Sequence, residues 1–197
     1  MGNRVFFSFH YQDVTDFRAN VVRNHWVAKP NRDAAGFYDA SLWEATKKQG
    51  KTALKSLINL GLNNTSNTCV LIGSSSYARP WVRYELLKSF KRGNHIFGVH
   101  INGIKGKDRN TKDLGPNPLE YLGVTYSDDG STATLWERTG GTWAEYSEID
   151  GSASYSVNVG PAHRGKGFNL FELLFHVSME RRRRLRELFD LGVLSLV

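Results

Sequence analysis

The sequence of 197 residues has a single cysteine, Cys69, and no run of apolar residues long enough to cross a membrane. One cysteine cannot form a disulfide within the chain and cannot anchor a structural zinc site. A membrane-spanning helix needs about 20 consecutive apolar residues, and the residues after Met1 also lack the apolar segment of a secretory signal. We therefore predict a cytoplasmic protein in which Cys69 is a small buried hydrophobic residue of a strand.

The motifs of several common enzyme classes are missing as well. No Gly-x-Gly-x-x-Gly follows a predicted strand and no Gly-Lys-Ser/Thr phosphate loop is present, which argues against hydride-transfer enzymes and triphosphate-binding loops. The six histidines contain no pair at metal-ligand spacing on a helix, so we expect no metal. Ser74, Ser75 and Ser76 lead into a tyrosine instead of forming Gly-x-Ser-x-Gly, so they fit hydrogen-bonding roles better than that of a nucleophile.

The charge balance favours anionic partners without choosing among them. Lys and Arg number 26 against 19 Asp and Glu, which gives a net charge of +7. NAD, nucleotides and nucleic acid are all compatible with this charge. The densest basic run, residues 181–186, is interleaved with acidic residues and leucines, as is typical of an amphipathic helix with a solvated face. Binding of nucleic acid or a membrane surface by this run is therefore not favoured.

Short apolar strands alternate with helical patterns in the first part of the chain. Aromatic or β-branched runs predict strands at residues 4–10, 36–40, 69–72 and 95–101. Apolar residues at helical spacing predict helices over about 13–28, 54–62 and 80–92. In the first helix, we expect Asp13 as the N-cap and Val14, Phe17, Val21 and Val22 as the buried face. This alternation predicts an α/β fold with a mainly parallel sheet covered by helices, followed by an exposed loop over residues 102–118.

Beyond that loop the pattern changes to antiparallel strands and a helix. Two β-prone segments flank Thr139-Gly140-Gly141, which predicts a β-hairpin. The apolar series Phe168, Phe171, Leu174 and Phe175 predicts a C-terminal helix that continues through the arginine run. We therefore expect a main domain at residues 1–125 and a C-terminal extension at 126–197, a hairpin and an amphipathic basic helix packed on the same domain.

The segment from Cys69 to Leu86 carries the clearest functional signal. An apolar strand runs into serines and then into a helix that starts at Pro80 and stops at Gly93. In open α/β sheets, ligands bind beyond the carboxyl ends of the strands. Trp81 and Glu85 are four positions apart and share one helix face, near its first exposed turn. An aromatic ring and a carboxylate are therefore predicted at the mouth of a nucleotide cleft.

Three segments resemble signature segments of TIR domains in order and spacing. They are Phe6-Phe-Ser-Phe-His10, Leu71-Ile-Gly-Ser-Ser-Ser-Tyr77 and Trp81-x-x-x-Glu85-Leu86. More closely, Arg4 to Asp13, Asp39 to Glu44, Gly115 to Pro118 and the hairpin resemble the TIR-like proteins of the bacterial Thoeris anti-phage system. The sequence departs from TIR domains at Asp39-Ala-Ser-Leu-Trp-Glu44, where the usual loop with Arg-Asp and Pro-Gly is absent, so the usual loop-mediated assembly is in question.

The resemblance implies a flavodoxin-like sheet and an NAD+ nucleosidase that is also an ADP-ribosyl cyclase. Such an enzyme releases nicotinamide and makes a cyclic ADP-ribose isomer, an immune signal read by a separate effector protein of the ThsA type. NAD+ is then the substrate, and no cofactor is implied. The ring linkage of the product, a phage-derived activator and self-association through the C-terminal helix are left open.

The resemblance also implies roles for six residues. Glu85 aligns with the catalytic glutamate of the family, and Trp81 orients it or closes the pocket wall. Ser8, Phe9 and His10 at the end of the first strand are expected beside the substrate, with Phe9 stacking and His10 meeting phosphate. Ser74 matches the serine after the central strand and is expected to bind a ribose or the pyrophosphate.

Other interpretations of the same residues stay open at this stage. Without the resemblance, Glu85 reads as an exposed helix carboxylate and Trp81 as a core anchor. A TIR domain can also be a non-enzymatic signalling adaptor. A nucleoside deoxyribosyltransferase-like enzyme resembles TIR domains in sheet topology and uses a glutamate at a ribosyl carbon as well.

Overall fold

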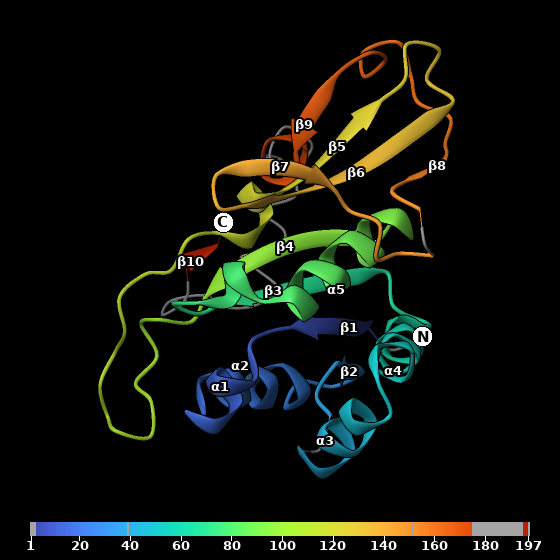
Figure 1. The fold of residues 1–197 in the computed structure, drawn as a ribbon. Helices are drawn as coiled ribbons and strands as arrows, with labels where there is room; N and C mark the ends of the chain where they lie inside the picture. The colour runs from blue at the N-terminus through green and yellow to red at the C-terminus, as the bar shows by residue number, and fades with distance from the viewer. Residues whose placement is uncertain (1–2, 39, 151, 175–194, 197) are drawn as a thin grey trace.

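A parallel sheet with helices on both faces forms the first part of the chain (Figure 1). The computed structural model describes residues 3–38, 40–150, 152–174 and 195–196. The strand order is β10-β4-β3-β1-β2, in which β1 to β4 are parallel and β10 is antiparallel to β4. The strands are β1 (Asn3–Ser8), β2 (Arg32–Ala35), β3 (Asn67–Ile72), β4 (His95–His100) and β10 (Ser195–Leu196). This sheet confirms the predicted α/β fold.

The helices divide between the two faces of this sheet as right-handed crossovers require. They are α1 (Tyr11–Thr15), α2 (Arg18–Val27), α3 (Ala40–Lys48), α4 (Lys51–Leu62) and α5 (Pro80–Lys91), with short 3-10 helices η1 (Ser76–Ala78) and η2 (Pro118–Tyr121). Side chains alternate along β3, so Cys69 and Leu71 pack with α2, whereas Val70 and Ile72 pack with α4 and α5. The strand β3 is thus buried on both faces, as its unbroken apolar run predicts.

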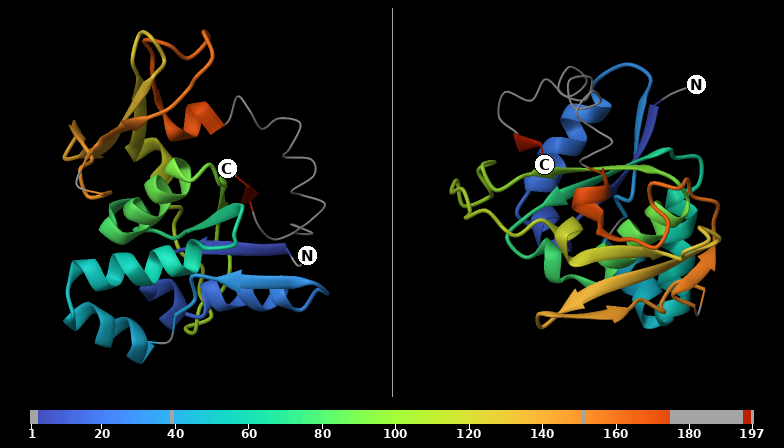
Figure 2. Two further views of the ribbon diagram at one scale, coloured as in Figure 1. Left: turned by 90° about the vertical axis from the view of Figure 1, so that its right-hand side faces the viewer. Right: turned by 90° about the horizontal axis from the view of Figure 1, so that it is seen from above.

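A second, antiparallel sheet covers the outer side of α5 (Figures 1 and 2). Its strands are β5 (Leu122–Tyr126), β6 (Thr132–Thr139), β7 (Thr142–Glu145), β8 (Ser154–Ser156) and β9 (Gly167–Asn169). The predicted hairpin is confirmed, since Thr139 pairs with Thr142 across Gly140 and Gly141, which both have positive φ. Leu122, Val124 and Leu135 of this sheet join Val82 and Leu86 of α5 in one core.

The predicted buried face of the first helix is confirmed at Val22 and wrong at Phe17 and Val21, which are exposed. The chain forms two helices instead, because Phe17 adopts φ +68° between them and its side chain is 52% exposed. The buried residues of α2 are Arg18, Ala19, Val22 and Trp26. Arg18 can be buried because its guanidinium donates to the carbonyls of Ile104 and Asn110 and pairs with Asp16. Asp13 lies inside α1 instead of capping it.

Other segments also differ from the sequence prediction. The second strand ends at Ala35, so residues 36–38 follow it, and α3 occupies a segment for which no helix was expected. Phe168 lies in β9, and the helix begins only after it, at residue 170. The arginine run and Phe175 lie outside the described residues. Among the described residues, the helices are too short or too polar to span a lipid bilayer.

Gly36 is the position where the turn after β2 most strictly requires glycine. Its φ is +89°, and a Cβ added there would lie 2.3 Å from the carbonyl oxygen of Phe7. We expect Gly36→Ala to lower the free energy of unfolding in urea by about 1–3 kcal/mol more than Gly50→Ala does, because a backbone atom must move. Gly50 is the matched control, since its φ is +100° and no atom lies within 4 Å of an added Cβ. Equal losses in the two variants would show that the close approach to Phe7 has no energetic weight.

Candidate active site

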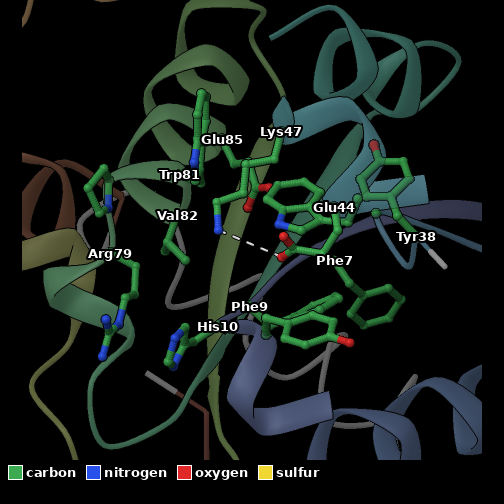
Figure 3. Close-up of a pocket in the computed structure, with 14 residues that line it drawn as sticks. Phe7, Phe9, His10, Tyr38, Glu44, Lys47, Arg79, Trp81, Val82 and Glu85 are labelled. Carbon is green, nitrogen blue, oxygen red and sulfur yellow. Dashed lines mark ion pairs between the residues drawn. The ribbon is translucent and has the colours of Figure 1, made fainter. Parts of the chain in front are cut away.

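A pocket of about 360 Å³ opens at the carboxyl end of β1, between α3 and the first half of α5 (Figure 3). In the strand order, β2 lies on one side of β1 and β3 lies on the other. The topological switch point of the sheet is therefore between β1 and β3. Open α/β sheets bind ligands at such a point. The pocket is lined by Phe7, Phe9, His10, Tyr11, Gly36, Tyr38, Trp43, Glu44, Lys47, Arg79, Pro80, Trp81, Val82 and Glu85.

Glu85 is the acidic residue at the inner end of this pocket. The sequence placed it near an exposed turn, which is wrong, because the residue is 6% exposed. It belongs to α5, whose outer side is covered by the antiparallel sheet. Ser8, the last residue of β1, is fully buried and donates a hydrogen bond of 2.6 Å from Oγ to Oε2 of Glu85. This hydrogen bond joins two elements that lie 77 positions apart in the sequence.

Burial shifts the proton equilibrium of this carboxyl group strongly. Removing a carboxylate from water disfavours its charged form, and this raises the pKa of Glu85 to about 8. The hydrogen bond from Ser8 acts in the opposite direction and lowers the pKa of Glu85. The acid is therefore largely protonated at neutral pH in the free protein, and a cation placed beside it would favour the carboxylate.

Aromatic rings form the walls around the acid. Trp81 packs edge to face against Trp43 at 6.4 Å and against Tyr84 at 6.0 Å between ring centroids. Tyr38 stacks on Trp43 at 6.0 Å, and its hydroxyl donates to the carbonyl of Leu57. Phe9 lines the pocket and is held by Phe37, with 4.5 Å between ring centroids. A flat ring system such as nicotinamide or adenine suits walls of this kind.

Basic groups gather at the end of the pocket near the start of α5. The hydroxyl of Ser75 contacts both Arg79 Nη2, at 3.1 Å, and His10 Nδ1, at 3.5 Å. Burial, together with the charges of Arg79 and Lys112, lowers the pKa of His10. His10 is therefore a neutral hydrogen-bonding group at pH 7, whereas Arg79 keeps its charge.

The structure brings four of the six predicted site residues to the pocket wall, namely Phe9, His10, Trp81 and Glu85. Ser8 lies behind Glu85 and does not reach the wall, so it acts on the acid and not on a substrate directly.

Ser74 does not line this pocket. Its hydroxyl donates to the carbonyl of Asp113 and accepts from the amide of Asn102, because the long loop after β4 folds over the end of β3. Gly115 packs so closely there that an added Cβ would lie 2.2 Å from the carbonyl oxygen of Gly73.

Several lining residues were not found by sequence reasoning. Tyr38, Trp43, Glu44 and Lys47 come from α3 and the segment before it, the region noted only as a departure from TIR domains. Arg79 precedes Trp81 by two positions and was not among the predicted site residues. Its position at the N-cap of α5 was the available signal.

No group of three or more His, Cys, Asp or Glu side chains in the described parts of the chain is arranged to hold a metal ion. The polar groups of the pocket are instead single hydrogen-bonding or charged side chains among aromatic rings.

The fold and the pocket define a TIR-like protein with a buried glutamate. Residues 6–105 match the family model described as Thoeris protein ThsB, TIR-like domain. The chain is also 59% identical over 172 residues to a Bacillus cereus (strain MSX-D12) protein named "Putative cyclic ADP-D-ribose synthase ThsB1", an alignment that covers 86% of this chain and 88% of that protein. The chain therefore belongs to the ThsB family of TIR-like proteins, and the resemblance to TIR domains is confirmed.

The raised pKa of Glu85 predicts a specific pH dependence of stability. The ordinary pKa of 4.5 applies to the unfolded chain and about 8 to the folded protein, so the folded protein holds the extra proton between these values. Raising the pH through this window therefore lowers the free energy of unfolding. Glu85→Gln removes the titrating group, so its free energy of unfolding should fall less than that of the wild type from about pH 5 to about pH 8.

Urea unfolding at a series of pH values measures both curves. His10 and Asp13 titrate in both proteins, so the difference between the curves isolates Glu85. Two parallel curves would contradict the burial of an uncharged acid at this position.

Proposed function

We propose that this protein is a TIR-like NAD+ nucleosidase and ADP-ribosyl cyclase, which releases nicotinamide from NAD+ and closes the remaining ADP-ribose into a ring. The observation that carries the proposal is the buried Glu85 at the inner end of an aromatic pocket, held by Ser8. The family and the name of the Bacillus cereus relative support the same activity. Nothing in this chemistry requires a metal or a resident cofactor.

The chemistry of the substrate fits a single carboxylate. When the bond between nicotinamide and C1 of its ribose breaks, the bonding electrons pass to the cationic pyridinium ring, and neutral nicotinamide leaves. No general acid has to protonate the leaving group, unlike in an ordinary glycoside hydrolysis. Positive charge develops on the ribose, and an ionised carboxylate beside C1 stabilises or captures it. Glu85 has this role in the proposal.

Binding of NAD+ would also prepare the acid. The pyridinium ring carries a positive charge, and a positive charge near Glu85 favours the carboxylate over the protonated form. Ser8 keeps the carboxylate in place with its hydrogen bond. Trp81 supports α5 at the pocket wall, and Phe9 offers a ring face for stacking.

Ring closure needs a nucleophile from the same molecule to reach C1 before water does. The adenine end and the hydroxyls of NAD+ are the available nucleophiles. The aromatic walls of Trp43, Trp81 and Tyr38 exclude water and restrict how the molecule folds back. Water attack in place of ring closure would give linear ADP-ribose. We propose that the cyclic product is a signal read by a separate effector of the ThsA type in anti-phage defence.

The product formed in phage-exposed cells tests the proposed function. We expect cells with the wild-type protein to accumulate a cyclic ADP-ribose isomer, identified by mass and chromatography, and to lose NAD+. Glu85→Gln should lower product formation at least about 100-fold, because the charge that stabilises the transition state is lost. An adaptor or a nucleoside deoxyribosyltransferase would produce no such compound.

Glu44→Gln is the matched control for this experiment. Glu44 is another glutamate of the same pocket, but it is exposed and pairs with Lys47 at 3.7 Å (Figure 3). We expect this variant to keep most of the product. Equal product from Glu85→Gln and the wild type would overturn the proposed function.

The pH dependence of turnover gives a second prediction. Since kcat/KM reports the free enzyme and the carboxylate is the active form, kcat/KM for nicotinamide release should rise with pH toward a plateau above about 8. Ser8→Ala removes a hydrogen bond that lowers the pKa of Glu85, so the rise should move to higher pH.

Ser89→Ala is the matched control for that shift. Ser89 is a buried serine of α5, the helix that carries Glu85. Its hydroxyl accepts a hydrogen bond from Thr68 and does not contact Glu85. Its pH profile should coincide with that of the wild type. A profile that moves equally in both variants would mean that Ser8 does not tune the acid.

A further inference from the structure

Arg79 has a hydrogen-bonding group that the protein itself does not use. Its side chain lines the pocket, and Nη2 donates to the hydroxyl of Ser75 at 3.1 Å. Its Nε is buried and has no hydrogen-bond acceptor in the described part of the chain. A buried donor without an acceptor costs free energy, so such a group in a native protein calls for an explanation.

Two other buried arginines each have an acceptor for Nε and a paired carboxylate. Arg18 donates through Nε to the carbonyl of Ile104 and pairs with Asp16 at 3.0 Å. Arg83 donates through Nε to the carbonyl of Tyr77 and pairs with Glu137 at 2.7 Å. Arg79 forms no ion pair with any described residue, although it lies within two helical turns of Glu85.

The charges around Arg79 point to an anionic ligand. Of the lining residues that can carry positive charge, Lys47 is paired with Glu44, and His10 is neutral at pH 7 because its pKa is lowered. Arg79 is therefore the permanently charged group of the pocket that no carboxylate neutralises within 4 Å among the described residues. A planar guanidinium with free N–H groups matches the oxygen atoms of a phosphate.

We propose that Arg79 forms a subsite for the pyrophosphate of the dinucleotide, at the opposite end of the pocket from the reacting carbon. The inference rests on the proposed function and deepens it. Arg79 and Glu85 are separated by six positions of the same helix, which is about 9 Å along its axis. In NAD+ the reacting carbon and the pyrophosphate are joined through one ribose, so Glu85 and Arg79 can contact the two ends of that sugar.

This placement gives Arg79 a role in ring closure as well as in binding. After nicotinamide leaves, the ADP-ribosyl group has to stay bound until its own nucleophile reaches C1. A fixed pyrophosphate holds both halves of the molecule at that moment. Without this contact the adenine half would be free to swing away, and water would compete for C1.

The test compares two substrates across three variants. Nicotinamide release is measured for NAD+ and for nicotinamide riboside, which has the same reacting bond and no pyrophosphate. We expect Arg79→Gln to raise KM for NAD+ about 10- to 100-fold, with a smaller effect on kcat. The effect on nicotinamide riboside should be much smaller. Arg79→Lys should recover part of the loss, because it restores the charge without the planar fork.

Arg92→Gln is the matched control, since Arg92 follows the other end of α5 and donates to the carbonyl of Leu62. Its kinetic constants should equal those of the wild type. The ratio of cyclic to linear product provides a further readout, which should fall in Arg79→Gln and not in Arg92→Gln. An equal loss on both substrates would assign Arg79 a structural role and overturn the subsite, as would an unchanged KM for NAD+.

Binding measurements separate this inference from the proposed function. Calorimetric titration of the Glu85→Gln protein with ADP-ribose and with inorganic pyrophosphate needs no turnover. We expect both to bind, and the additional change Arg79→Gln to weaken each about 10-fold or more. Nicotinamide release without any Arg79-dependent binding would overturn the subsite alone. Arg79-dependent binding without nicotinamide release in phage-exposed cells would overturn the proposed function and leave an anion site.

Discussion

The hydrogen bond between Ser8 and Glu85 is the contact around which the pocket is organised. It connects the last residue of β1 with the middle of α5, and both partners are buried. A carboxyl group is costly to bury in its charged form, and Ser8 is the one side-chain hydrogen-bond partner found for it among the described residues. The acid is therefore kept protonated in the resting protein. In the proposed reaction, the positive charge of the bound substrate favours the ionised form of the carboxyl group, which burial disfavours.

The antiparallel sheet contributes no residue to this pocket, yet it helps to fix the position of Glu85 by packing against α5. It covers α5 from outside, so the helix has a sheet on each side (Figure 2). Arg83 adds a direct link, because its guanidinium pairs with Glu137 and donates to Thr139 of β6. A helix that is packed on two sides cannot shift without breaking both interfaces. The acid is thus held by parts of the chain that lie far from it in sequence.

The sequence predicted those parts of the fold in which local pattern and tertiary structure agree. The strand β3, the start of α5 at Pro80 and the Gly140-Gly141 hairpin are all signalled by short-range chemistry. The burial of Arg18 on α2 could not be predicted in this way, because it depends on partners supplied by a distant loop.

The same distinction applies to the candidate site. Glu85, Trp81, Phe9 and His10 belong to segments that carry the family pattern, and the structure brings them together. Tyr38 and Trp43 reach the pocket through the packing of α3, which no spacing rule encodes, whereas Arg79 stands directly before the predicted helix start at Pro80. Ser74 had the right spacing, but its hydroxyl is engaged by the loop after β4.

The alternation of side chains along β1 has a consequence for how members of this family can diverge. Phe6 and Phe7 point to opposite faces of the sheet, and Ser8 follows on the face of Glu85. Inserting or deleting a single residue within β1 would turn a phenylalanine toward the acid and carry the serine to the other face. The long loop after β4 has no such alternation to preserve, although its carbonyls at Ile104 and Asn110 accept hydrogen bonds from buried Arg18. Changes of length should therefore be tolerated between these contacts more readily than in the first strand.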